Sequence, residues 1–252
     1  MSGKVWEYLQ DRLRHGPLHM TLIDPATSGT KGGQAIAQEA SRAGTHAIMV
    51  GGSTGITTAN LDELVATLKA TTDVPVIYFP SSGGHMSPFV DAIYFLSTLN
   101  SRNPRFITGE QMRGAPLVHA VGTEAIGMGY LIVEPGMTVG RVSEADLIPR
   151  AAPKGAQKAV AYSLMAEYFG MKLVYLEAGS GAPEPVPVEI VRAVREALTI
   201  PLVVGGGIRT REQAEGILRA GADILVTGTI AEQGHFDRLR EIIRAVHATR
   251  RE

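Results

Sequence analysis

Two carboxylates end short apolar runs, a position from which an acidic side chain can take part in chemistry. Glu177 is followed by Ala-Gly-Ser-Gly, and Asp24 is followed by a proline. A carboxylate beside a loop of backbone N–H donors is a candidate general base. A single carboxylate such as Asp24 can hold Mg²⁺, which takes few protein ligands and prefers oxygen. Each acid also has a structural interpretation, since a serine or backbone donor could satisfy Glu177 and Asp24 could cap a turn.

Glycine-rich stretches supply a second kind of chemistry. The sequence reads Gly-Gly-Gly-Ile-Arg-Thr at 205–210 and Thr-Gly-Thr at 227–229. Such loops allow backbone N–H groups to converge on an anion, and a helix N-terminus adds about half a positive charge. One loop of this kind could be only a tight turn, but two in adjacent units favour a phosphate site. A third stretch, 51–55, contains Ser53, whose hydroxyl could contact a metal or a diphosphate.

These residues need a scaffold, and the hydrophobic pattern predicts one. Eight short apolar or β-branched runs alternate with segments of helical composition, which is typical of parallel strands with right-handed crossovers. Eight such units predict an α/β fold, a single (β/α)8 TIM barrel over residues 1–252, with its active site at the carboxyl ends of the strands. The predicted strands are 18–23, 46–50, 74–79, 92–97, 126–133, 172–176, 202–204 and 223–226.

Several segments between the strands have specific signatures. Residues 186–198 place apolar side chains on one stripe of a helix, and Thr210 with Gln213 forms a capping box. The segment 80–91 is rich in Gly, Pro and Ser and too short for a crossover helix, so we expect the helix after strand three to be missing or replaced by an irregular segment. In strand five, Gly127 and Gly129 could either leave a groove or allow close packing of a neighbour.

Composition excludes several classes of protein. The chain has 252 residues, no cysteine and a net charge of −1. The near-neutral balance argues against a nucleic-acid partner, and the lack of cysteine excludes thiolate metal sites and thiol catalysis. The charged N-terminus and the absence of a long apolar run predict a soluble protein of the cytoplasm. The histidines, among them His19, His46, His85 and His119, are scattered, so we expect core or surface groups and not ligands.

Five motifs in the same order resemble those of the geranylgeranylglyceryl phosphate synthase family, which includes archaeal lipid enzymes and bacterial relatives that attach a longer prenyl chain. The resemblance covers nearly the whole chain, including DAIYFLSTLNSRNP at 91–104. GGGIRT alone is weak, because many phosphate-binding barrels share it, but the combination is specific. The motifs are LIDP at 22–25, MVGGSTG at 49–55, YLEAGSGAP at 175–183, VVGGGIRT at 203–210 and VTGT at 226–229.

The resemblance implies a Mg²⁺-dependent transfer of a prenyl group, expected to be geranylgeranyl, from its diphosphate to the C3 hydroxyl of sn-glycerol 1-phosphate. By position, Glu177 matches the family's proposed base, and Asp24 and Ser53 match its Mg²⁺ ligands. The family barrel also lacks an ordinary helix after strand three. The residues that match the glycerol phosphate site are Tyr175, Leu176, Glu177, Ala178, Gly179, Ser180, Gly181, Gly206, Gly207, Gly228 and Thr229.

The chain departs from the family pattern at two positions. Many relatives carry a basic residue close to the LIDP aspartate, whereas here the first downstream is Lys31. Thr229 stands where asparagine is common, and a backbone N–H would serve equally there. The first departure leaves open how the charge of the diphosphate is met.

Two alternatives to prenyl transfer remain from the residues alone. One is a phosphosugar isomerase or synthase barrel of amino-acid biosynthesis, and the other is a phosphate-binding barrel without catalysis. By resemblance we also expect a homo-oligomer, a dimer or larger, and transient contact with a membrane when the lipid product leaves. The prenyl chain length is not encoded in any motif, because it depends on the depth of a groove.

Overall fold

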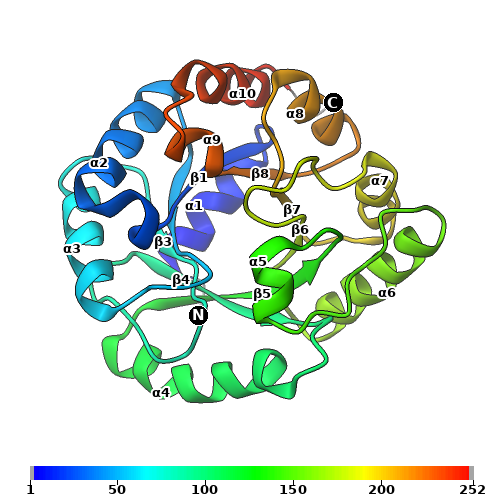
Figure 1. The fold of residues 1–252 in the computed structure, drawn as a ribbon, viewed down its shortest axis with the longest axis horizontal. Helices are drawn as coiled ribbons and strands as arrows, with labels where there is room; N and C mark the ends of the chain where they lie inside the picture. The colour runs from blue at the N-terminus through cyan, green and yellow to red at the C-terminus, as the bar shows by residue number, and fades with distance from the viewer. Residues whose placement is uncertain (1–2, 250–252) are drawn as a thin grey trace.

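The computed structural model describes residues 3–249, and in it eight parallel strands form a closed barrel in which β8 pairs with β1 (Figure 1). This confirms the predicted TIM barrel. Each predicted strand recurs within two residues at either end. The predicted domain limits, 1 and 252, lie outside the described residues. The strands are β1 (Leu18–Ile23), β2 (Ala47–Val50), β3 (Val76–Tyr78), β4 (Ala92–Thr98), β5 (Glu124–Ile132), β6 (Leu173–Glu177), β7 (Leu202–Gly205) and β8 (Ile224–Thr227).

Helices surround the barrel, and α1 lies across the end at which the strands begin (Figure 1). Within the described residues, none of these helices is long and apolar enough to cross a bilayer. They are α1 (Lys4–Leu13), α2 (Pro25–Ala43), α3 (Thr58–Lys69), the π-helical turn η1 (Arg105–Gly109), α4 (Glu110–Val121), α5 (Met137–Val142), α6 (Lys154–Tyr168), α7 (Val188–Ala197), α8 (Arg211–Arg219), α9 (Thr229–Glu232) and α10 (Phe236–Ala248).

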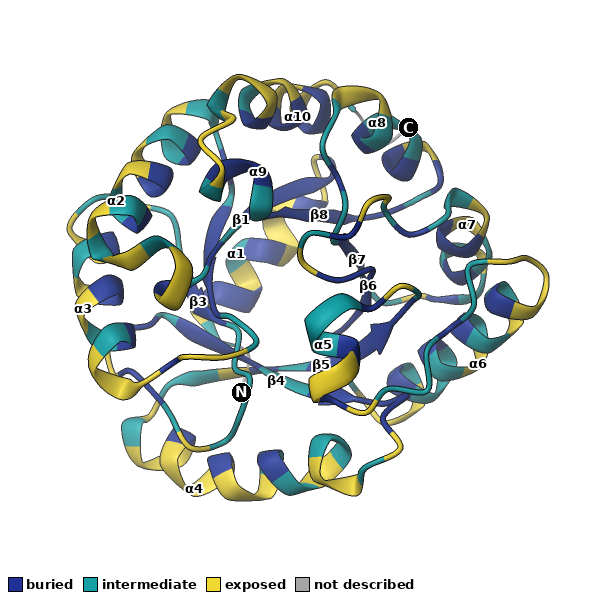
Figure 2. Cartoon of the chain, in the orientation of Figure 1, coloured by how far each residue is buried: buried dark blue, intermediate teal, exposed yellow. Residues whose placement is uncertain are grey.

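The core has two layers because side chains of a strand alternate between its faces. In β6, Tyr175 belongs to the cluster inside the barrel, whereas Leu176 belongs to the cluster between strands and helices. The helices bury the stripe that faces the strands and expose the other side (Figure 2). The predicted capping box of α8 is confirmed, since Gln213 N–H donates to the Thr210 hydroxyl at 3.3 Å.

An irregular loop joins β3 to β4 in place of a helix, as predicted. The loop is fixed to α4, because Gly83 N–H donates to the Glu110 carboxylate at 2.7 Å. A Cβ atom at position 83 would lie 2.1 Å from the Glu110 carbonyl oxygen, so only glycine allows this approach. These contacts hold the loop against α4, and several of its residues line the cavity at the carboxyl ends of the strands.

Gly129 of β5 allows close packing of a neighbour, which is one of the two interpretations of the sequence. A Cβ atom at position 129 would lie 2.6 Å from the Cβ of Ala166 in α6. Neither Gly127 nor Gly129 lines the cavity that opens at the carboxyl ends of the strands. Neither glycine therefore forms the predicted groove; the missing side chain of Gly129 admits α6 on the outer face of the strand, whereas a Cβ atom at position 127 would make only an ordinary contact of 3.8 Å with the Met171 Cα.

Candidate functional site

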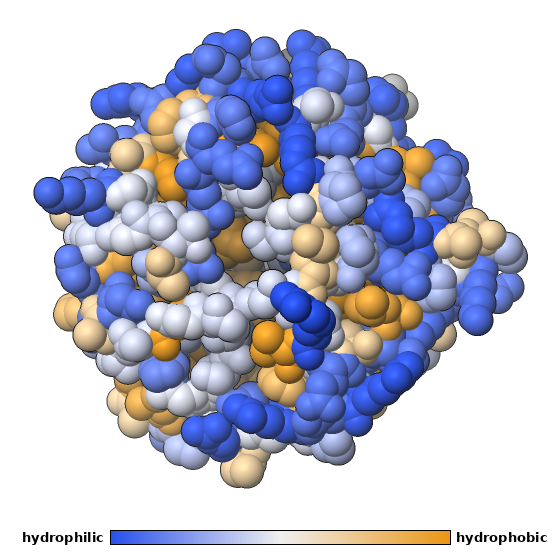
Figure 3. Space-filling model, in the orientation of Figure 1, coloured by the Kyte–Doolittle hydropathy of each residue, from blue (hydrophilic) through white to orange (hydrophobic). Residues whose placement is uncertain are grey.

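A cavity of about 290 Å³ opens at the carboxyl ends of the strands. Figure 3 shows the hollow at the centre of this face, with apolar side chains inside it. A smaller cavity of about 40 Å³ lies beside it. Leu22, Glu177, Ser180 and Gly228 line both cavities, so the predicted base lies where they meet.

Among the acidic residues that line the two cavities, Glu177 is the most buried, with 5% of its surface exposed. Its carboxylate accepts a hydrogen bond from Gly179 N–H at 2.6 Å and others from the hydroxyls of Tyr130 and Tyr175. Burial raises the pKa of Glu177, and these three hydrogen bonds offset part of that rise. A desolvated carboxylate with a raised pKa is a stronger base than one in water, as proton abstraction requires.

Three aromatic residues pack against one another next to Glu177. The ring centroids of Tyr130 and Tyr175 lie 5.3 Å apart in an edge-to-face arrangement, and Phe79 packs against both. This packing orients both hydroxyls toward the carboxylate. Tyr175 is thus a core aromatic and a hydrogen-bond donor at once. A Cβ atom at position 205 would lie 2.0 Å from its hydroxyl oxygen, which explains the glycine there.

The smaller cavity is built from the glycine-rich loops after β7 and β8. Gly206 has φ +81° and Gly207 has φ +73°, in the left-handed region that favours glycine. A Cβ atom at position 206 would lie 2.4 Å from Glu177 Oε1. Thr229 joins two loops, because its hydroxyl accepts from Gly181 N–H at 3.2 Å. The result is a small, glycine-lined cavity beside Glu177, of the kind that holds phosphate in barrels.

Arg209 belongs to this cavity, although sequence reasoning did not single it out. Its guanidinium donates to the carbonyl oxygens of Gly181 at 3.1 Å and Pro183 at 3.0 Å, and to that of Ala182. These bonds tie the loop after β7 to the loop after β6. Arg209 therefore shapes the cavity mainly by holding the loop after β6 in place.

The predicted glycerol phosphate residues fall into three groups. The side chains of Leu176 and Ala178 lie in the outer core, so only their backbone can approach a ligand. Gly179 contributes through its N–H to Glu177. The others line the smaller cavity or, like Gly181, contact a residue that does, and their role in binding stays a prediction.

The sequence allowed two interpretations of Asp24, a cap of a turn and a ligand for Mg²⁺, and its position in the structure is compatible with both. It precedes α2 and caps it, accepting from Ala26 N–H at 2.8 Å, and it also lines the large cavity with Ser53. Burial raises the pKa of Asp24. A Cβ atom at position 52 would lie 2.1 Å from the Asp24 carboxylate, so Gly52 leaves room for that group.

This rim offers oxygen ligands of the type that Mg²⁺ binds. Among residues 3–249 there is no group of three or more His, Cys, Asp or Glu side chains that could hold a metal. A magnesium ion here would therefore complete its shell with hydroxyl, substrate or water oxygens, as Mg²⁺ commonly does beside phosphates. The donor set of Asp24 and Ser53 fits the ion on these terms.

A further acid at this rim was not predicted. Glu232, on α9, accepts from Asp24 N–H at 3.3 Å and lines the large cavity. Its pKa is raised by burial and also by the negative charge of Asp24. The two residues are 208 positions apart, so no local motif could pair them.

The outer part of the large cavity is apolar and runs between α4 and α5. Two of its members reach the surface, Leu117 with 38% and Val142 with 39% of their area exposed. An apolar channel that starts near carboxylates and opens to solvent suits a ligand with a charged head and an alkyl tail. The apolar lining residues here are Phe95, Leu96, Phe106, Leu117, Val118, Val139 and Val142.

Comparison with known proteins gives full-length matches. The model of the PcrB family matches residues 9–248. The geranylgeranylglyceryl phosphate synthase of Thermococcus gammatolerans is 50% identical over 240 residues, which are 95% of this chain and 94% of that protein. The crystal structure of (S)-3-O-geranylgeranylglyceryl phosphate synthase from Thermoplasma acidophilum, in complex with its substrate sn-glycerol-1-phosphate, is 45% identical with a TM-score of 0.93, covering 99% of this chain and all (100%) of that one. Wild-type GGGPS from Thermoplasma volcanium is 43% identical with a TM-score of 0.94 and full (100%) coverage of both chains.

Proposed function

The chain belongs to the PcrB family, and from this premise we infer that it is a geranylgeranylglyceryl phosphate synthase. It joins a prenyl group to the C3 hydroxyl of sn-glycerol 1-phosphate. The hydroxyl oxygen forms a bond to C1 of the prenyl group, the bond between C1 and the diphosphate oxygen breaks, and the hydroxyl proton passes to a base. The products are a prenyl ether of glycerol phosphate and diphosphate.

The single observation that carries the mechanism is the position of Glu177 between the two cavities. Phosphate bound by the loops at Gly206, Gly207 and Gly228 would place the glycerol hydroxyl groups toward this carboxylate. Glu177 then accepts the proton of the attacking hydroxyl, and Tyr130 and Tyr175 keep its oxygens in place. A positioned base of this kind contributes about 10²- to 10⁴-fold in rate.

The other substrate fits the large cavity. Its alkyl tail would lie in the apolar channel between α4 and α5, where each buried CH₂ contributes about 0.8 kcal/mol. Its diphosphate would lie at the rim beside Asp24 and Ser53. Mg²⁺ held by these two residues would supply positive charge against the charge that develops on the departing diphosphate.

Three expectations about the cell belong to the same proposal. The cytoplasm is the expected compartment, because both substrates expected here are phosphorylated metabolites. Association into a dimer or larger assembly and transient contact with a membrane stay predictions from the resemblance.

The match at 50% identity over 95% of the chain favours prenyl transfer over the isomerase alternative.

The replacement Glu177→Gln tests the role of the base and separates an enzyme from a phosphate-binding protein. Gln has nearly the same shape but cannot accept the proton, so kcat should fall about 10²- to 10⁴-fold. Binding of sn-glycerol 1-phosphate, measured by calorimetry, should stay within a few-fold of the original chain. The matched control is Glu189→Gln, an exposed residue of α7 that should change neither quantity. A Glu177→Gln variant with full kcat would refute the assignment of the base, and a wild-type chain that binds glycerol phosphate but forms no ether would favour the binding protein.

A further inference from the structure

The large cavity has an unusual charge for a site that accepts a diphosphate. Among the described residues no Lys or Arg lines it. Bringing a polyanion into a cavity rich in carboxylates costs free energy unless cations or N–H donors face it. The acids that line it are Asp24, Glu110, Glu177 and Glu232.

His85 is the one side chain with a basic nitrogen that lines the cavity, within the part of the chain that the structure describes. It lies half-buried on the loop between β3 and β4. Its Nδ1 is 3.4 Å from the Thr58 hydroxyl at the start of α3, and its Nε2 has no hydrogen-bond partner in residues 3–249. Thr58 follows the loop that carries Ser53, so His85 shares a rim with the residues that would hold the metal.

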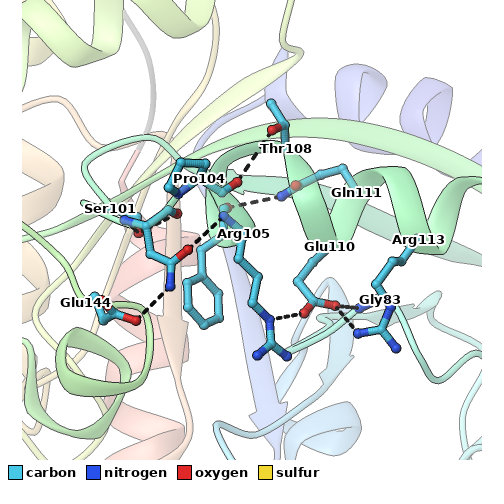
Figure 4. A network of polar contacts seen from close by, with 11 residues as sticks. Gly83, Ser101, Pro104, Arg105, Thr108, Glu110, Gln111, Arg113 and Glu144 are labelled. Carbon is cyan, nitrogen blue, oxygen red and sulfur yellow. Dashed lines mark hydrogen bonds and ion pairs between the residues drawn. The ribbon is translucent and has the colours of Figure 1, made fainter.

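Two arginines nearby are already engaged. Arg105 donates to the Glu110 carboxylate at 2.5 Å, and Arg113 lies 3.5 Å from it (Figure 4). Burial acts to raise the pKa of Glu110, but the hydrogen bond from Gly83 N–H and the two arginines together keep this pKa below its usual value. Glu110 balances only one of these two positive charges, but neither guanidinium lines the cavity, so neither replaces a cation at its rim.

The same carboxylate fixes the loop that carries His85. Glu110 accepts from Gly83 N–H at 2.7 Å, two positions before the histidine (Figure 4). On the other side of the histidine, Met86 is buried with 5% of its surface exposed. The imidazole is thus attached to a segment that is held at both sides. A donor that is held in place before binding loses little entropy when the ligand arrives.

We propose that His85 donates a hydrogen bond from Nε2 to the diphosphate of the prenyl substrate and thereby strengthens the binding of that substrate. The proposal rests on the proposed function, since it assigns one contact within the same site. It also answers how this chain binds a diphosphate without a basic residue at 25–30. The contact belongs to the diphosphate alone, because His85 does not line the smaller cavity expected to hold glycerol phosphate.

The test compares His85→Ala and His85→Lys with His119→Gln, an exposed histidine of α4 that does not line the cavity. Hydrogen bonds to charged groups are strong enough that His85→Ala should raise KM for geranylgeranyl diphosphate about tenfold or more. The Kd of inorganic pyrophosphate with Mg²⁺, measured by calorimetry, should rise by a similar factor. KM for sn-glycerol 1-phosphate should stay within twofold. His85→Lys keeps a donor and should retain most of the affinity, and His119→Gln should match the original chain.

Two results would overturn the proposal. One is a His85→Ala variant that binds pyrophosphate and the prenyl substrate as the original chain does. The other is a parallel rise in both KM values with a lowered melting temperature, which would mean that His85 only supports the loop. Pyrophosphate binding needs no turnover, so it is independent of the proposed function. If the original chain makes no ether product yet loses pyrophosphate affinity on His85→Ala, the proposed function fails while the contact stands.

Discussion

Acid should destabilise this fold through His19, a residue far from the proposed chemistry. His19 lies in β1 and is fully buried, with 0% of its surface exposed. Its Nδ1 is 3.0 Å from the Thr45 hydroxyl and its Nε2 is 2.9 Å from the Thr227 hydroxyl. Burial, helped by the charges of His46 and His247, lowers the pKa of His19 from 6.5 to about 3. The folded protein therefore keeps this imidazole neutral under conditions in which the unfolded chain protonates it.

The sign and size of the effect follow from the difference between the two pKa values. Above pH 6.5 both states hold a neutral imidazole, and the stability that His19 contributes is fully present. As the pH falls from 6.5 toward 3, the unfolded state binds a proton that the folded state does not, so stability decreases. Each pKa unit corresponds to about 1.4 kcal/mol. The loss due to His19 is therefore about 2 kcal/mol at pH 5 and about 4 kcal/mol near pH 3.

Urea denaturation between pH 7.5 and 5 measures this loss. The variant His19→Asn removes the titrating group, and its lower stability at pH 7.5 does not matter because only the change with pH is compared. His15→Asn, at an exposed histidine, is the control. The original chain should lose about 2 kcal/mol more than His19→Asn over this range, and the control should behave like the original. His46, whose pKa is lowered to about 4, titrates in all three proteins. Equal pH slopes for the original chain and His19→Asn would refute the reasoning.

Two further predictions concern the site. Tyr130→Phe removes a hydroxyl that lowers the pKa of Glu177, so this pKa should rise further. The acidic limb of the plot of kcat against pH should then shift to higher pH. A limb that stays at the same pH would contradict the hydrogen bond between Tyr130 and Glu177. Leu117→Asp places a charge at the outer end of the apolar channel. We expect KM to rise severalfold for geranylgeranyl diphosphate and little for geranyl diphosphate, because the shorter tail should end before Leu117. An equal rise for both substrates would mean that the long tail does not pass Leu117.

The strands and the two main acids could be predicted because their signals are local. Each strand is a short apolar run bounded by turn residues, and parallel strands bring their carboxyl ends to one edge. Asp24 and Glu177 follow β1 or end β6, so their placement at the same mouth required only the fold. The missing crossover after β3 was predictable for the same reason, since Gly, Pro and Ser in the segment 80–91 do not favour a helix.

The contacts made by residues distant in sequence could not be predicted. Glu232 meets Asp24 across 208 positions, and Glu110 meets Gly83 across 27. The π-helical turn at 105–109 also depends on tertiary contacts, because the Ser97 hydroxyl donates to the Ile107 carbonyl at 2.6 Å. Hydrophobic periodicity carries no information about such partners. It is these contacts that fix the loop with His85 and the acid beside Asp24.

The two ends of the reaction need different surroundings, and the barrel supplies both within one cavity. The proposed base, Glu177, needs surroundings without water, and aromatic rings and a glycine loop lie around it. The diphosphate must leave into water, and Asp24 at the rim is only half-buried. Leu22 lines both cavities and its Cβ would lie 3.3 Å from a Cβ atom at position 228, so an apolar side chain stands at their junction. Replacing Leu22 by a polar residue would admit water toward Glu177 and lower its pKa, which would weaken the proposed base.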